Sequence, residues 1–261
     1  MSQVDELPNK NLRDVINNLT LDIKYRYMPF RAYYRYRAYK YMAYKNIEMG
    51  LLKYLCSPER ASVDIGANLG MFTYYLARYS PTVFAFEPNP YPYRILKSVI
   101  DRNVKLEHAA MTDVSGDVDL IVWRSSKGWT SNGAAIECNL DVVVDHTVVK
   151  VPGYRLDDLD LGEIGFIKID TEGHELAVLN GSLKSIELYR PNLFVEVEYF
   201  RTQEKESEVF TLLKDLNYDG FFLVNGVLTN ISKFSADEFQ NREACENENR
   251  RYIKDFIFLP R

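Results

Sequence analysis

Apolar and polar positions along the chain change period in a regular way from residue 62 onward. Short apolar runs that end in Gly, Pro or an acidic residue indicate strands, and segments with apolar residues three or four apart indicate helices. Strands are predicted at residues 62–65, 82–87, 104–110, 164–170, 192–198 and 255–260. Helices are predicted at residues 70–79, 92–100, 175–189 and 204–216. This alternation is typical of a parallel sheet with helical crossovers, so we expect the α/β class.

Two regions depart from the alternation. Residues 117–123 and 141–151 are predicted β segments around a polar insert at residues 125–139. We expect this insert to overhang the site and to influence the choice of substrate. Asn225-Gly226 suits a type I′ turn and therefore predicts a hairpin.

The N-terminal part has a composition of its own. No Gly or Pro follows Pro29 until Gly50, which predicts a helix, so we take residues 1–50 as an N-terminal helical extension and 51–261 as one domain. Residues 24–45 contain eight Tyr, seven Lys or Arg, and no Asp or Glu. The segment has three interpretations: contact with an anionic membrane, binding of phosphate groups, or a structural helix that covers the site or forms a homodimer. Because the tyrosines spread around the helix, the structural interpretation is favoured.

Composition narrows the class of protein. The 261 residues are 46% apolar and 26% charged, as in globular proteins, and the net charge of −5 argues against a nucleic-acid partner. No apolar run approaches the ~18 residues that cross a bilayer, and the first 20 residues lack a signal-peptide core. The three cysteines form no C-x-x-C pair, so we expect a reducing, cytoplasmic location with at most peripheral membrane contact.

The most informative segment is residues 63–70, where a buried strand runs into a glycine turn and a helix. Gly66 allows close approach of a ligand to the backbone, and Gly70 allows the helix to pack against the sheet. The spacing G-x-x-x-G matches neither the dinucleotide fingerprint nor the P-loop. Asp64 lies two residues before the first glycine, where a carboxylate suits an ammonium or sulfonium better than a pyrophosphate.

A second carboxylate follows at the end of the next predicted strand. Glu87 precedes Pro88 and stands 23 residues after Asp64. A carboxylate at this place is able to accept both hydroxyls of an adenosine ribose. The two acids together favour S-adenosylmethionine (SAM), whereas the glycine turn alone is also consistent with a tight packing turn.

Residues 63–70, the Glu87-Pro88 pair and the sequence K-I-D-T-E-G-H-E at residues 168–175 together resemble the FkbM family of SAM-dependent methyltransferases. The likeness covers about residues 60–200 and the terminal FIFLP. It implies the class I methyltransferase (Rossmann-like) fold, a mostly parallel seven-stranded sheet with helices on both faces and an antiparallel last strand. It also implies cofactor contacts from Asp64, Gly66, Ala67, Asn68 and Gly70 at the methionine end, Glu87 and Pro88 at the ribose, and Ala110 and Met111 near adenine. Small apolar residues such as these last two are equally good core.

Methyl transfer to a hydroxyl also needs a group that removes the proton. Polar residues gather at the carboxyl ends of two predicted strands: Asp170, Glu172, His174 and Glu175 at the end of one, and Glu196 and Glu198 on the other. Asp170 is expected to face the SAM methyl group and the acceptor. His174 has a suitable pKa for a general base, and Glu172 and Glu196 are alternatives. Glu175 is expected to be a first-turn acid of a helix.

The resemblance predicts a SAM-dependent O-methyltransferase whose acceptor is a sugar hydroxyl, in a nucleotide sugar or a surface glycan. A non-sugar acceptor such as a polyketide and a non-catalytic SAM-binding or membrane-docked scaffold are the alternatives. A nicotinamide-dependent oxidoreductase is disfavoured by the missing fingerprint and by Asp64. A divalent metal at the acidic edge is not favoured, because no H-x-x-x-H or acid-rich paired loop is present. Glu198 stands where many relatives are expected to have His, so the identity of the base stays open.

Overall fold

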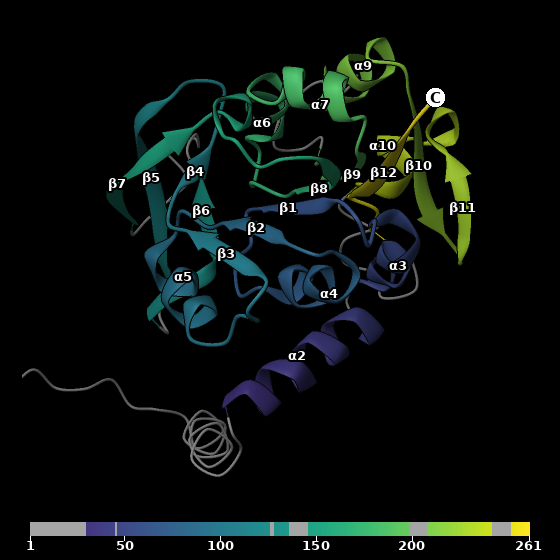
Figure 1. Ribbon diagram of the computed structural model, residues 1–261. Coiled ribbons are helices and arrows are strands. Elements are labelled where there is room, and N and C mark those ends of the chain that lie inside the picture. Colours follow the sequence, from purple (N-terminus) through teal and green to yellow (C-terminus); the bar gives the residue numbers. More distant parts are fainter. Residues whose placement is uncertain (1–29, 45, 126–127, 136–145, 199–207, 242–251) are drawn as a thin grey trace, which may run out of the picture.

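A computed structural model describes residues 30–44, 46–125, 128–135, 146–198, 208–241 and 252–261, arranged around two sheets (Figure 1). The larger sheet has eight strands in the order β11-β10-β12-β9-β8-β1-β2-β3. Its strands are β1 (Ala61–Ile65), β2 (Val83–Phe86), β3 (Val104–Glu107), β8 (Ile164–Ile169), β9 (Asn192–Glu196), β10 (Tyr218–Val224), β11 (Val227–Asn230) and β12 (Asp255–Pro260). Neighbouring strands from β3 to β9 are parallel, and β12 is antiparallel to both β9 and β10.

Helices cover both faces of this sheet (Figure 1). One apolar core contains residues of α6 (Glu175–Asn180), α7 (Leu183–Tyr189) and α9 (Glu208–Asp215). The other contains residues of α2 (Phe30–Tyr44), α3 (Leu52–Leu55), α4 (Met71–Tyr79) and α5 (Pro90–Lys97). The short elements are α10 (Ala236–Phe239) and the 3-10 helices η1 (Ile47–Leu51), η3 (Leu156–Asp158) and η4 (Ile231–Lys233).

This architecture confirms the expected α/β class I fold, with one strand more than predicted. The additional strand is β11, the second arm of the predicted hairpin, which pairs antiparallel with β10 at the sheet edge. Asn225 and Gly226 have φ of 51° and 76°, as a type I′ turn requires. The antiparallel last strand is β12, as predicted.

A four-stranded second sheet corrects the prediction for residues 104–110. Its order is β4-β7-β5-β6, from β4 (Ala110–Met111), β5 (Gly116–Ser125), β6 (Gly128–Ala135) and β7 (His146–Tyr154). The chain leaves the large sheet after Glu107, and Ala110 and Met111 pair with β7 instead. Apolar periodicity indicates a strand but not its partner, so the sequence does not reveal that this run is divided between two sheets.

The polar insert at 125–139 also differs from a simple overhanging loop. Its residues 128–135 form β6, which pairs antiparallel with β5. Residues 126–127 and 136–145 lie outside the described part of the chain, and so do the first residues of the predicted segments at 141–151 and 204–216.

The predicted helix at 175–189 is two helices, α6 and α7, separated by Gly181 and Ser182. A Cβ atom at Gly181 would lie 2.0 Å from the carbonyl oxygen of Thr112. Only glycine therefore permits this approach between α6 and the end of β4.

The helix predicted after Pro29 is present as α2, although it ends at Tyr44 and η1 follows. Tyr34 and Ala38 are buried, the Tyr34 hydroxyl donates to the Gly70 carbonyl, and the Tyr34 ring lies 5.6 Å from that of Tyr74 in α4. The described part of the N-terminal extension thus packs on the domain beside the glycine turn. Among the described residues, no helix combines the length and the apolar character needed to cross a membrane.

Candidate functional site

The glycine turn joins β1 to α4 at the carboxyl edge of the large sheet. Gly66 and Gly70 have φ of 73° and 77°. A Cβ at Gly66 would lie 1.9 Å from the Asp170 carbonyl oxygen, and a Cβ at Gly70 would lie 2.2 Å from Leu96. Contacts within the protein therefore require glycine at both positions, whether or not a ligand also approaches the backbone there.

Asp64 lies beneath this turn and is fully buried. Its Oδ2 accepts a hydrogen bond of 2.5 Å from the Thr73 hydroxyl, and its Oδ1 lies 3.4 Å from the Lys168 ammonium. The predicted acid is therefore held within the protein by Thr73 and Lys168 and is not exposed to solvent.

Lys168 is a site residue that the sequence analysis missed. Its Nζ donates to the carbonyl oxygens of Gly66 at 2.7 Å and Ile65 at 3.2 Å, and lies 3.4 Å from Asp170 Oδ2. Burial alone would lower the pKa of Lys168, but Asp170 and Asp64 outweigh burial and hold that pKa above its usual value. A lysine in an otherwise apolar strand was the available signal, because a buried charge needs partners.

Glu87 directly follows β2 beside the turn and is also buried. Its Oε2 accepts from the Asn68 amide at 2.6 Å, and its Oε1 accepts from the Asn89 amide at 2.7 Å. Burial raises the pKa of Glu87 to about 7, although both amides favour the ionised form. Asn68 has φ of 50°, and Ala67 and Pro88 adjoin the same turn. The predicted ribose acceptor is thus held against the glycine turn.

Ala110 and Met111 lie where the chain enters the second sheet. Both are 2% exposed and belong to apolar core clusters. Their contact with adenine stays a prediction.

The candidate catalytic acids converge after β8 and β9. The carboxylate oxygens of Glu172, Glu196 and Glu198 lie within 4.8 Å of one another. Asp170 has a side chain that is 32% exposed, and that of Glu196 is 5% exposed. Burial and Asp170 raise the pKa of Glu196 well above its usual value, and Lys254, 2.5 Å away, opposes this shift. The edge therefore gathers several carboxylates, and the pKa of one of them, Glu196, is raised.

His174 has a different environment. Its buried ring places Nε2 3.0 Å from the hydroxyl of Thr112, after β4. Glu175, in the first turn of α6 as expected, accepts from the amides of Thr171 at 2.9 Å and Gly173 at 3.1 Å. Glu175 thus closes the loop that carries the other acids.

The N-terminal segment also contributes groups that were not predicted. Burial raises the pKa of Tyr41 in α2 to about 12, and the charges of Asp170 and Asp255 add to this effect. Asn46 Nδ2 donates to Asp255 Oδ2 at 2.8 Å. Burial raises the pKa of Asp255 to about 7, with Lys254 opposing. No residue pattern in the sequence linked this segment to the last strand.

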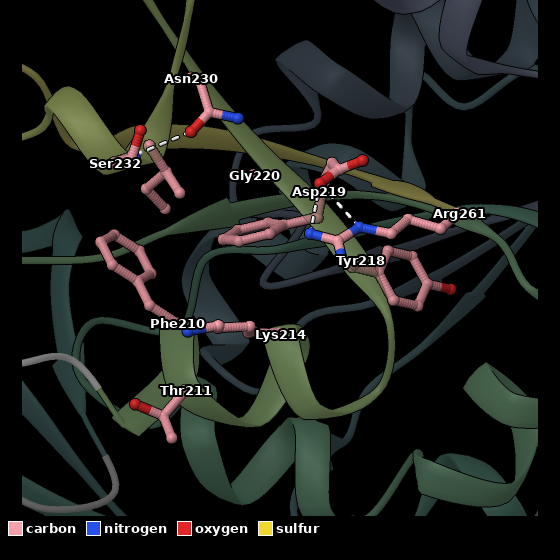
Figure 2. A pocket seen from close by; sticks show the side chains of 11 residues that line it. Phe210, Thr211, Lys214, Tyr218, Asp219, Gly220, Asn230, Ser232 and Arg261 are labelled. Atoms are coloured by element: carbon pink, nitrogen blue, oxygen red, sulfur yellow. Dashed lines mark hydrogen bonds and ion pairs between the residues drawn. The ribbon is translucent and has the colours of Figure 1, made fainter.

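A separate hollow of about 440 Å³ lies at the opposite edge, where β10 begins and β12 ends (Figure 2). Phe210, Ile231 and Phe258 contribute apolar surface to it, and Arg261 reaches across to Asp219 with a bond of 2.8 Å. None of the predicted site residues lines it, so it is distinct from the carboxyl edge.

The residues at the carboxyl edge fit SAM better than a dinucleotide. Asp64, Glu87 and Asp170 surround the turn, and Lys168 pairs with Asp64 and Asp170. An excess of carboxylates repels a pyrophosphate and attracts the sulfonium and ammonium of SAM. Glu87 retains lone pairs that suit ribose hydroxyls, since each carboxylate oxygen offers two.

A comparison with protein families identifies the family of this chain. The sequence model of the methyltransferase FkbM domain matches residues 64–219, more than half of the chain. The chain therefore belongs to the FkbM methyltransferase domain family.

A curated relative is "Methyltransferase 1" of Beauveria bassiana, 29% identical over 145 residues that cover 46% of this chain and 57% of the relative. A crystal structure of methyltransferase FkbM from Methylobacillus flagellatus has 14% identity and a TM-score of 0.49, covering 94% of this chain and 60% of that chain. A putative methyltransferase from Streptococcus mutans in complex with SAH has 11% identity and a TM-score of 0.43, covering 82% and 96%. The chain thus spans less than two thirds of the first two relatives.

Proposed function

We propose that this chain is a SAM-dependent O-methyltransferase whose acceptor is a sugar hydroxyl, in a nucleotide sugar or a surface glycan. The observation that carries the proposal is the convergence of carboxylates beside the glycine turn. A hydroxyl is a weak nucleophile at neutral pH, and such a site supplies the bases that it needs. The family membership supports methyl transfer, and the acceptor class is carried by the resemblance.

The proposed roles follow from the contacts. Glu87 would hold the ribose hydroxyls, and Lys168 with Asp64 would fix the turn that receives the methionine end. When bound, SAM supplies an electrophilic methyl group on a sulfonium that leaves as a neutral sulfide. Asp170 and Glu196 would align the acceptor hydroxyl and accept its proton. Glu172 is a second candidate base, and His174 is a less direct one because its ring already contacts Thr112.

There are two alternatives to the methylation of a sugar hydroxyl. A polyketide or other non-sugar hydroxyl would use the same residues with a different acceptor surface. A non-catalytic SAM-binding scaffold would keep the glycine turn without turnover, and the clustered carboxylates are the observation against it.

The test is transfer of a labelled methyl group from SAM to nucleotide sugars, extracted glycolipids and hydroxylated small molecules. Label in one sugar fraction that disappears in Asp170→Asn would support the proposal. Label confined to non-sugar hydroxyls would overturn the acceptor class. SAM binding without transfer to any acceptor would overturn O-methyl transfer in favour of the scaffold.

We also propose that α2 contacts an anionic membrane surface peripherally. Its cations Arg31, Arg35, Arg37 and Lys40 are all exposed, as are Tyr36 and Tyr39, at 51% and 60%. Its buried side, through Tyr34, is fixed to the glycine turn. Cations interleaved with tyrosines on one exposed helix suit anionic head groups, and a glycan acceptor on a lipid would be brought near the site.

A further inference from the structure

Lys254 is a cation at the acidic edge that the family motifs do not include. It immediately precedes β12, and its carbonyl oxygen accepts from the Val197 amide at 2.8 Å. The next residue, Asp255, pairs in register with Glu196 of β9. Backbone pairing thus places Lys254 opposite Val197, one residue from Glu196, and the long lysine side chain reaches the Glu196 carboxylate.

The two side chains form a close ion pair. Lys254 Nζ lies 2.5 Å from Glu196 Oε2, and the side chains are 40% and 5% exposed. The carboxylate is therefore buried, and its ammonium partner is partly exposed to solvent.

Glu196 faces charged groups from several elements. Asp170 and Lys168 come from β8 and its end, and Lys254 and Asp255 come from the last strand. Glu172 and Glu198 supply carboxylates within 4.8 Å. Burial and nearby carboxylates favour a protonated Glu196, and a protonated carboxyl is unable to accept a proton from a hydroxyl.

We propose that Lys254 is a positioning residue that keeps Glu196 ionised and oriented as the general base for the acceptor hydroxyl. This inference rests on the proposed function. The hydroxyl proton would pass to a Glu196 oxygen, and the hydroxyl oxygen would use the electron pair that it keeps to bond to the methyl carbon. The bond from that carbon to the sulfur of SAM would break, and its electron pair would stay on the departing sulfide. Lys254 acts through Glu196 and stays charged throughout, so it neither gives nor takes the proton.

A purely structural ion pair would give a different result from a positioning pair. Loss of a structural pair lowers the stability of the protein. It does not change how turnover of the folded protein depends on pH. Loss of a positioning pair moves the acidic limb of the pH profile. The decisive variants are Lys254→Met, which removes the charge, and Lys254→Arg, which keeps it. The control is Lys150→Met, which breaks an exposed pair with Asp119 at 3.2 Å in the second sheet.

With a methylated acceptor in hand, the acidic limb of kcat/KM should move up by at least one pH unit in Lys254→Met. Lys254→Arg and Lys150→Met should keep the wild-type limb, and the SAM dissociation constant should change less than threefold in all three. An unchanged limb in a folded Lys254→Met protein overturns the proposal.

A second readout needs neither SAM nor an acceptor. Carbon-13 NMR of protein labelled at glutamate carboxyl carbons, with Glu196→Gln to assign the signal, reports whether Glu196 is ionised. We expect an ionised Glu196 at pH 7 in the wild type and a protonated one in Lys254→Met. Equal ionisation in both overturns the proposal even if methyl transfer is confirmed, and the expected difference supports it even if the acceptor class is wrong.

The uncharged variant Lys254→Gln replaces Lys254→Met if the latter fails to fold. If neither folds, the wild-type titration decides, because a Glu196 that is protonated at pH 7 beside the native lysine contradicts the proposal.

Discussion

The Glu87 carboxyl combines two demands that conflict at neutral pH. Burial raises its pKa to about 7, yet it must be ionised to accept two ribose hydroxyls. A raised carboxyl pKa means that the folded protein holds this proton more tightly than the unfolded chain does. The protonated Glu87 carboxyl therefore stabilises the folded protein fully below the unfolded pKa of 4.5. This stabilisation is lost as the pH rises through about 7. SAM affinity should change in the opposite direction.

We expect the SAM dissociation constant to fall about tenfold between pH 6 and pH 8, because Glu87 passes from mostly protonated to mostly ionised over that interval. Titration calorimetry at several pH values measures this change. In Glu87→Gln, binding should be weaker and this pH dependence should disappear. An equally steep dependence in the variant would assign the titration to another group.

Individual residues were predictable where a motif fixed their place at the sheet edge. Asp64, Glu87 and Asp170 were expected there, and the structure brings them to the same turn. Lys168 and Lys254 were missed, because pairing of a charge across strands depends on register, which apolar periodicity does not specify. The sequence indicates which acidic residues lie at this sheet edge, whereas the structure shows which lysines form ion pairs with them.

At the scale of elements, the break between α6 and α7 depends on one glycine. The Gly181 backbone has φ of −76°, which any residue adopts, so the constraint is the Thr112 carbonyl and not the torsion angle. We expect Gly181→Ala to lower the free energy of unfolding by about 1–3 kcal/mol, the usual cost of overpacking. Denaturant unfolding measures this change.

The matched control for this substitution is Gly50→Ala, whose Cβ would meet no atom within 4 Å. We expect a change within about 0.5 kcal/mol there. A Gly181→Ala protein as stable as the control would show that the chain near Thr112 yields easily and that the break has another cause.

The order of elements was more predictable than their pairing. Strands and helices that alternate leave a clear period, and the hairpin turn was confirmed by its backbone angles. The transfer of Ala110 and Met111 to a second sheet had no local signal, because the same apolar residues suit either sheet. The contact of α2 with the glycine turn depends on tertiary packing through Tyr34, which a Tyr-rich pattern suggests only in general terms.

At the scale of the whole molecule, charge is distributed unevenly. The chain carries a net charge of −5, while the described part of α2 exposes four cations and contains no acidic residue. An anionic surface would therefore attract α2 and repel much of the remaining protein, which favours one orientation. Because α2 is fixed beside the glycine turn, that orientation would also set how the carboxyl edge faces the surface.

We expect the full chain to sediment with vesicles that contain phosphatidylglycerol, and not with neutral phosphatidylcholine vesicles. Each cation near an anionic surface contributes about 1 kcal/mol, so the triple variant Arg35→Gln, Arg37→Gln, Lys40→Gln should bind about 100-fold more weakly.

The control variant is Lys214→Gln, which removes an exposed cation of α9 at the opposite sheet edge and should bind as the wild type does. Raised salt should weaken the wild type toward the triple variant. Equal sedimentation of the triple variant and the wild type would exclude α2 as the segment that contacts the membrane. If α2 binds a second copy of the chain instead, the substitutions would change the oligomeric state in the absence of vesicles.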